Sequence, residues 1–248
     1  MLNQKPALLL EINKKSQLDI KGVSFVVGYY KYSSFAGLYF NYEEIKALDN
    51  KQNIFVLINA LIHQKDLEDF KVEIDKLIPL GVNFIVQDLG ALSYIYTHKI
   101  KETKIIFNGY TFICNPDDYD AFKELFDIDI TLSNELKHEE IVEFTSEDIM
   151  LTMYGYTPIY QSYRKVVSLF EEYRNQKIDR NQTLYLKEDT RDDMFPTIEN
   201  EYGTVVFRSK PLSRIENRDS YLNFKYWYIS SLFMENEELE KVLEELNK

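Results

Sequence analysis

Two acidic residues of this 248-residue chain stand directly after apolar runs, where they could carry out acid–base chemistry: Asp88 and Glu135. Paired carboxylates do this work when burial raises the pKa of one of them. We therefore take Asp88 and Glu135 as candidate catalytic residues. The alternative is structural, with Asp88 capping the helix that follows it and Glu135 binding the amides of a first helical turn.

Amides, phenols and guanidinium groups accompany the two acids. Those that follow apolar runs are candidates for substrate binding: Asn59, Tyr110, Asn134 and Tyr154. Three more residues, Gln161, Arg164 and Arg191, come from a later segment that is expected to close over the same place. An arginine can hold a carboxylate or phosphate through a two-point fork. Alternatively, Arg164 and Arg191 pair with nearby acids such as Glu171, Asp189 or Asp192.

Metal and cofactor chemistry is not indicated by these residues. The chain has one cysteine, Cys114, and its three histidines have no second His or Cys at ligand spacing. It contains no GxGxxG sequence, phosphate-binding loop or serine elbow. We therefore expect no cofactor and no stoichiometric iron or zinc.

Eight short apolar runs rich in Val, Ile, Phe and Tyr are predicted to be strands. They are Ala7–Ile12, Ser24–Tyr29, Asn53–Ala60, Phe84–Leu89, Lys104–Tyr110, Asp129–Asn134, Ile149–Tyr154 and Asn223–Ile229. Continuous apolar runs of this kind are typical of parallel strands that are covered on both faces. Helical spacing of apolar residues separates several of them: Lys65–Leu80 before Gly81, Pro116–Phe126, and Asn236–Asn247 after the last strand.

Eight strands alternating with helices predict a TIM-like βα-barrel made by one domain, residues 1–248. Residues 156–222 are expected to be an insertion between the seventh and eighth strands. They contain a helix-type stretch, Tyr160–Arg174, and two β-type runs, Thr183–Lys187 and Thr204–Arg208, which together predict a helix plus a hairpin. An open doubly wound sheet is the alternative. In either fold the carboxyl ends of the strands would bring the candidate residues to one cavity.

Composition limits the function classes. The net charge of −12 argues against a broad nucleic-acid-binding face, although a local basic pocket remains possible. No apolar run approaches the ~20 residues that span a bilayer, and no signal peptide is visible, so we expect a cytoplasmic protein without membrane contact.

The segment Tyr154–Arg164 resembles the signature region of the collagenase-like peptidase family U32. Gly155, Gln161, Ser162 and Arg164 match that signature, whereas Tyr154 stands where the family usually has a histidine. Further blocks resemble the family in the same order: Phe40–Ile45, Val56–Asn59, Leu80–Gly90, Thr111–Asn115, Leu132–Ile141, and in the insertion Arg191, Phe195, Pro196, Gly203 and Thr204. The resemblance covers roughly residues 22 to 245.

The chain departs from the family pattern at positions that matter for chemistry. Phe35 and Asn134 stand where the resemblance implies arginines, and Tyr110 stands where it implies an acid. The cysteines that hold an iron–sulfur cluster in some branches are absent. The chain therefore looks like a shortened and divergent member.

Three functions follow from the resemblance. Several branches resemble proteins that hydroxylate a tRNA uridine or a ribosomal RNA base, with prephenate implicated, and some members work as pairs of related subunits. The first hypothesis is a subunit or accessory of tRNA uridine hydroxylation, with a heteromeric partner from the same family through which tRNA would bind. The second is a collagenase-like peptidase, although no Ser/His/Asp, Cys/His or metal arrangement is evident. The third is a non-catalytic binding or scaffold protein, which the acidic balance fits best.

Overall fold

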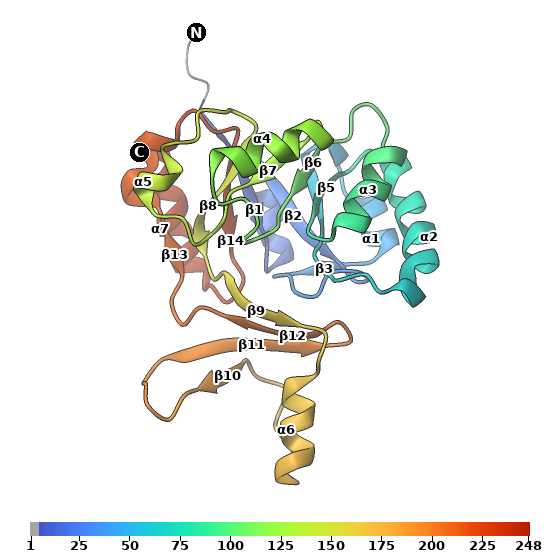
Figure 1. Ribbon diagram of the computed structural model, residues 1–248, viewed down its shortest axis with the longest axis vertical. Helices are drawn as coiled ribbons and strands as arrows, with labels where there is room; N and C mark the ends of the chain where they lie inside the picture. The colour runs from blue at the N-terminus through green and yellow to red at the C-terminus, as the bar shows by residue number, and fades with distance from the viewer. Residues whose placement is uncertain (1–4) are drawn as a thin grey trace.

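Eight parallel strands close into a barrel in the computed structural model, which describes residues 5–248 (Figure 1). The strands are β1 (Ala7–Glu11), β2 (Val23–Tyr29), β4 (Ile54–Ile58), β5 (Asn83–Val86), β6 (Ile105–Phe107), β7 (Asp129–Thr131), β8 (Ile149–Gly155) and β14 (Tyr226–Ser230). The first strand closes the barrel because it pairs in parallel with both β14 and β2. The predicted TIM-like barrel is confirmed, and the open sheet is excluded. The assignment of residues 1–248 to one domain stays a prediction, and residues 1–4 of that range lie outside the residues that the structure describes.

Helices connect most of the barrel strands. They are α1 (Tyr42–Ala47), α2 (Leu67–Leu77), α3 (Leu89–His98), α4 (Pro116–Leu125), α5 (His138–Ile141) and, after the last strand, α7 (Asn236–Asn247). Side-chain caps fix where several begin. The side chain of Asn115 accepts a hydrogen bond from the amide of Asp118, with Pro116 in the first turn, as its sequence predicts. None of the helices within residues 5–248 combines the length and apolar character needed to cross a bilayer.

Alternation along each barrel strand divides the apolar side chains between two layers. In β4, for example, Phe55 and Leu57 point into the barrel, while Ile54, Val56 and Ile58 pack against the surrounding elements. Side chains of this size fill the interior of an eight-stranded barrel. The inner layer contains Leu9, Val26, Ala36, Phe55, Leu57, Ile85, Ile106, Met150, Tyr226 and Tyr228.

The segment between β8 and β14 differs from the predicted helix plus hairpin. It contains β9 (Pro158–Ser162), α6 (Val166–Arg174), β10 (Leu184–Lys187), β11 (Met194–Asn200) and β12 (Gly203–Phe207). The four strands form an antiparallel sheet in the order β10-β11-β12-β9, called the inserted sheet below, which lies across one end of the barrel in Figure 1. Residues 160–162, expected to begin a helix, lie instead in β9 because they pair with β12, a partner far away in sequence. A short pair joins this segment to the barrel, with β13 (Leu212–Ser213) antiparallel to β8, and β3 (Tyr39–Phe40) lies beside β2.

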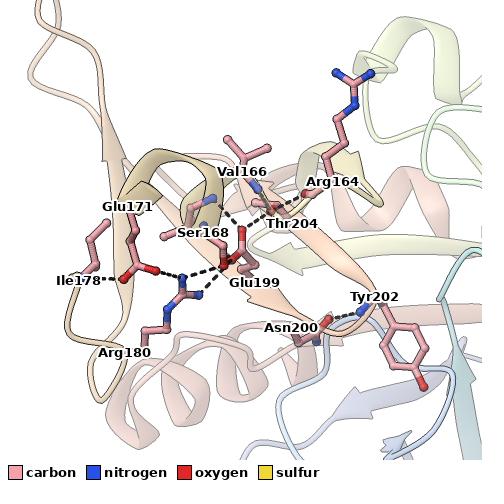
Figure 2. Close-up of polar contacts among 11 residues, drawn as sticks. Arg164, Val166, Ser168, Glu171, Ile178, Arg180, Glu199, Asn200, Tyr202 and Thr204 are labelled. Carbon is pink, nitrogen blue, oxygen red and sulfur yellow. Dashed lines mark hydrogen bonds and ion pairs between the residues drawn. The ribbon is translucent and has the colours of Figure 1, made fainter. Parts of the chain in front are cut away.

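Glu199 fixes α6 to one face of the inserted sheet (Figure 2). Its carboxylate accepts hydrogen bonds from the amides of Val167 and Ser168 at the start of α6, at 2.7 and 3.0 Å. Burial alone would raise the pKa of Glu199, but hydrogen bonds, the largest from Ser168, outweigh it and hold the pKa below its usual value. Arg180 completes the cluster by bridging Glu199 and Glu171, at 3.1 and 2.9 Å.

The inserted sheet depends on the glycine that begins β12, directly after the tight turn that follows β11. Gly203 has φ +109°, and a Cβ placed there would meet the carbonyl oxygen of Ser162 and lie 2.6 Å from the Cα of Tyr163. We expect Gly203→Ala to lower the free energy of unfolding by more than about 2 kcal/mol, since it adds a backbone clash to the strain of a positive φ. Gly22→Ala is the control, because Gly22 has φ +79° with no atom within 4 Å of a Cβ. Urea unfolding of both variants tests this, and equal losses would contradict it.

Candidate functional site

The carboxyl ends of the barrel strands face the inserted sheet, and a hydrogen-bonded chain of amides joins the two. Gln161 of β9 donates to the carbonyl oxygen of Asn59 at 3.0 Å and to the hydroxyl of Ser34 at 3.1 Å. Its own oxygen accepts from the amide of Gln87, which follows β5, at 2.8 Å. Asn59 in turn accepts from the backbone of Ser34 at 2.8 Å. The structure thus brings together Asn59 and Gln161, both predicted from the sequence to lie at this mouth.

Aromatic rings fill the mouth beside these amides. Phe35, from the buried loop after β2, lies between Tyr110 and Phe207 of β12, with ring centroids 5.8 and 5.1 Å away. Phe207 also contacts Phe233, which follows β14, at 5.1 Å. Val205 and Leu232 complete this cluster, which we call the aromatic plug. The inserted sheet therefore does not cover an open chamber but supplies part of what fills it.

The two candidate catalytic carboxylates have structural contacts. Asp88 begins α3, where its side chain accepts a hydrogen bond from the amide of Ala91 at 2.9 Å. Glu135 is more than half exposed, and its carboxylate lies 3.6 Å from the guanidinium of Arg208. Asp88 therefore caps α3, as the structural alternative to a catalytic role predicts. A catalytic role for either residue stays a prediction.

Asn134 lies at the mouth, whereas Tyr154 does not. Asn134 is buried, its backbone amide bonds the carbonyl of Tyr110, and its side-chain oxygen has no hydrogen-bond partner among residues 5–248. Tyr154 instead donates to Glu238 of α7 at 2.9 Å, on the outside of the barrel. A β-bulge causes this, because Thr152 pairs with Tyr228 whereas Tyr154 pairs with Ile229. Burial, and next the bond to Glu238, raises the pKa of Tyr154 to about 12.

Among residues 5–248, neither arginine of the predicted set makes a side-chain hydrogen bond or ion pair with the residues at the mouth. Arg191 lies exposed in the turn between β10 and β11, where its Nε is 3.5 Å from Glu188. Arg164 is exposed after β9, with its guanidinium directed away from the Glu199 cluster in Figure 2. Pairing with a nearby acid, the alternative considered for Arg191, is thus observed with Glu188, and a role for either arginine in substrate binding stays a prediction. Glu171, considered as a partner for these arginines, is bound by Arg180.

Sequence reasoning missed Glu11, the last residue of β1. It is 1% exposed and accepts hydrogen bonds from Tyr228, Ser230 and the amide of Gly37. Burial raises the pKa of this carboxyl above its usual value, against the lowering effect of those three bonds. A signal was present, since Glu11 is the one acid at the end of an otherwise apolar run, Ala7–Leu10. A buried carboxyl at the carboxyl end of a barrel strand is a candidate proton donor or acceptor.

Two cavities stand out in residues 5–248, and neither is lined by Glu11 or the aromatic plug. One, of about 430 Å³, opens at the rim between the loops after β2 and β4 and the inserted sheet, with walls that include Tyr30, Tyr163 and Tyr202. The other lies beside α6. Within the same residues no three His, Cys, Asp or Glu side chains gather as metal ligands would.

Gln161 should stabilise the contact between the inserted sheet and the barrel. Gln161→Ala removes three hydrogen bonds and leaves the side-chain nitrogen of the half-buried Gln87 without its partner, so we expect a loss of about 1–3 kcal/mol in the free energy of unfolding. Gln176→Ala is the matched control, because Gln176 is exposed in the loop after α6. Denaturant unfolding measures both, and a loss for Gln161→Ala no larger than the control's would show that these bonds contribute nothing.

Glu11 should make stability depend on pH. Because its folded-state pKa lies above the unfolded value, the folded protein loses stability as pH rises from the unfolded pKa toward the raised one. Glu11→Gln keeps the shape and removes the ionisation. We expect the variant's stability relative to the natural protein to increase as the pH rises from the unfolded-state pKa of Glu11 to its raised folded-state pKa. Urea unfolding across this range tests it, and a constant difference would mean that Glu11 does not ionise in this window.

Comparisons with known proteins agree with this fold. Residues 32–246 match Peptidase family U32. A solved structure, described as that of the U32 peptidase Mk0906, superposes with a TM-score of 0.55 at 16% sequence identity, covering 91% of this chain and 92% of the other. A comparison with curated protein sequences finds no match. The family match spans most of the chain, and the structural likeness shows that the barrel fold is shared. The chain therefore belongs to peptidase family U32.

Proposed function

We propose that this chain is an accessory subunit of a cytoplasmic tRNA uridine hydroxylation system rather than a working peptidase. The resemblance of its sequence blocks to the tRNA-modifying branch supports the reaction. In this proposal a related subunit of the same family supplies the reactive site and contacts the tRNA.

The observation that carries the accessory role is the contact between Phe35 and Tyr110. The family resemblance implies an arginine at the position of Phe35 and an acid at the position of Tyr110. Such a pair could hold and orient a charged substrate. In this chain the ring centroids of Phe35 and Tyr110 lie 5.8 Å apart, and Phe207 of the inserted sheet packs against Phe35. Apolar packing thus replaces a charged pair at the mouth.

The fate of the other candidates supports the same conclusion. Asp88 is used as a helix cap, Glu135 pairs with Arg208, and Tyr154 faces α7. The family name favours the peptidase, but hydrolysis of a peptide bond needs an activated nucleophile or a metal-bound water. The purely scaffolding alternative differs from our proposal only in whether tRNA hydroxylation depends on the chain.

Nucleoside analysis of a deletion strain tests the proposal. We expect mass spectrometry to show loss of 5-hydroxyuridine-type nucleosides from tRNA, with recovery on complementation. Asp88→Asn and Glu135→Gln should complement as well as the natural protein, because Asn also caps helices and the Glu135–Arg208 pair is a surface contact. Unchanged nucleosides in the deletion strain would refute the role in tRNA, and cleavage of gelatin by the purified protein would favour the peptidase.

A further inference from the structure

The cavity of about 430 Å³ at the rim of the barrel has walls made mostly of tyrosine. Three segments that are distant in sequence form it: the loop after β2, the loop between β4 and α2, and the ends of strands in the inserted sheet. The tyrosines among its lining residues are Tyr30, Tyr32, Tyr163 and Tyr202. A cavity of this size accommodates a small molecule or one long side chain.

Hydrogen bonds hold two of these tyrosines in place. The phenolic oxygen of Tyr202 accepts from the amide of Tyr32 at 2.7 Å, and the hydroxyl of Tyr32 donates to Asp69 of α2 at 2.7 Å. Asn200 fixes the turn that carries Tyr202 by accepting from its amide at 2.9 Å (Figure 2). Tyr32 has φ +67°, a conformation that is costly for a bulky residue and persists only where the surrounding contacts impose it. The walls of the cavity are therefore preorganised.

The charged groups in the lining leave an excess of negative charge. There are three acids and two lysines: Asp66, Asp69, Glu201, Lys31 and Lys65. Lys31 and Asp69 pair with each other at 3.0 Å. Asp66 and Glu201 have no cationic side chain within 4 Å among residues 5–248, so two unpaired carboxylates face one remaining ammonium group.

That remaining ammonium group lies against one of the tyrosine rings. The Nζ atom of Lys65 is 5.9 Å from the ring centroid of Tyr163, whose other neighbour is the ring of His63 at 3.8 Å. The face of an aromatic ring carries partial negative charge and attracts cations within about 6 Å. Lys65 is exposed, so a cation that enters from solvent can take its place at this ring.

We propose that this cavity binds an organic cation, an ammonium or guanidinium group on an aliphatic chain. The aliphatic part would contact the tyrosines with Leu61 and Ile62, and the charge would lie near Asp66 and Glu201. The net charge of −12 on the whole chain attracts such a ligand. The base of a nucleotide could stack on the tyrosines, but its phosphate would be repelled by the two carboxylates. The proposal does not depend on tRNA hydroxylation.

Isothermal titration calorimetry of the full-length protein with matched probes tests this inference. Butylguanidine is positively charged at neutral pH, whereas N-butylurea has nearly the same shape and no charge. We expect butylguanidine to bind at least about tenfold more tightly than N-butylurea, and also more tightly than uridine monophosphate. The proposal fails if butylguanidine does not bind, if the two matched probes bind equally, or if uridine monophosphate binds more tightly.

Substitutions in the lining test where the cation lies. Asp66→Asn and Glu201→Gln remove charge and keep shape, and each should weaken the binding of butylguanidine by about threefold or more. Tyr163→Leu should do the same by removing a ring face. The controls are Glu237→Gln and Tyr173→Leu, exposed residues outside the cavity that should leave binding unchanged. Unchanged binding in all three lining variants would overturn the proposal.

Lys65→Met gives the most discriminating result. It frees the ring of Tyr163 and removes a like charge, so we expect butylguanidine to bind about threefold more tightly. Weaker binding would overturn the proposal, because loss of this lysine should weaken only an anionic ligand.

A capped peptide, acetyl-glycyl-arginyl-glycinamide, distinguishes two sources of the cation. Binding about tenfold tighter than that of butylguanidine would support an arginine side chain of a partner protein. Binding that is equal or weaker would support a free small cation, and either result is consistent with the same site.

Discussion

The interior of the barrel has to be filled by side chains, and most of the structure depends on which residues supply them. An eight-stranded barrel has an interior just wide enough for side chains. From the amino ends of the strands to the middle of the barrel, this space is filled by large inward-pointing residues of the strands themselves, such as Phe55, Tyr226 and Tyr228. At the carboxyl end the strands stop, and the space is filled from elsewhere by Phe35, Phe207 and Tyr110. The inserted sheet is thus part of the core, and the amide of Gln161 sets where it lies.

The barrel strands could be predicted from the sequence because each is a local, nearly continuous apolar run. The same applies to α4, where Asn115 and Pro116 specify the start, and to α2, after which Gly81 adopts φ +75°. The local sequence pattern did not predict two strands of the inserted sheet, whose formation depends on pairing within that sheet. β9 reads as the start of a helix until it is paired with β12, and β11 carries no strong pattern of its own.

The candidate site was predictable only in part, for two physical reasons. Strand ends correctly place Asn59, Tyr110 and Asn134 at one mouth, since parallel strands share an edge. The direction of a side chain, however, depends on register, and a single bulge turns Tyr154 toward α7. Glu11 escaped notice because its role depends on contacts with Tyr228 and Ser230, more than 200 residues away in the chain.

The pairing of β1 with β14 has a consequence for how the protein comes into being. During synthesis β1 can acquire one of its two neighbours, β2, early, but the other neighbour, β14, consists of residues 226–230 and is made more than 200 residues after β1. Until β14 is made, the growing sheet therefore has two unpaired borders, at β1 and at the most recently made strand. Contacts of such long sequence separation form slowly, and open strand borders attract other chains. Closure, and with it burial of the Glu11 carboxyl, therefore waits until β14 has been made, and we expect the demand for chaperones to last until then.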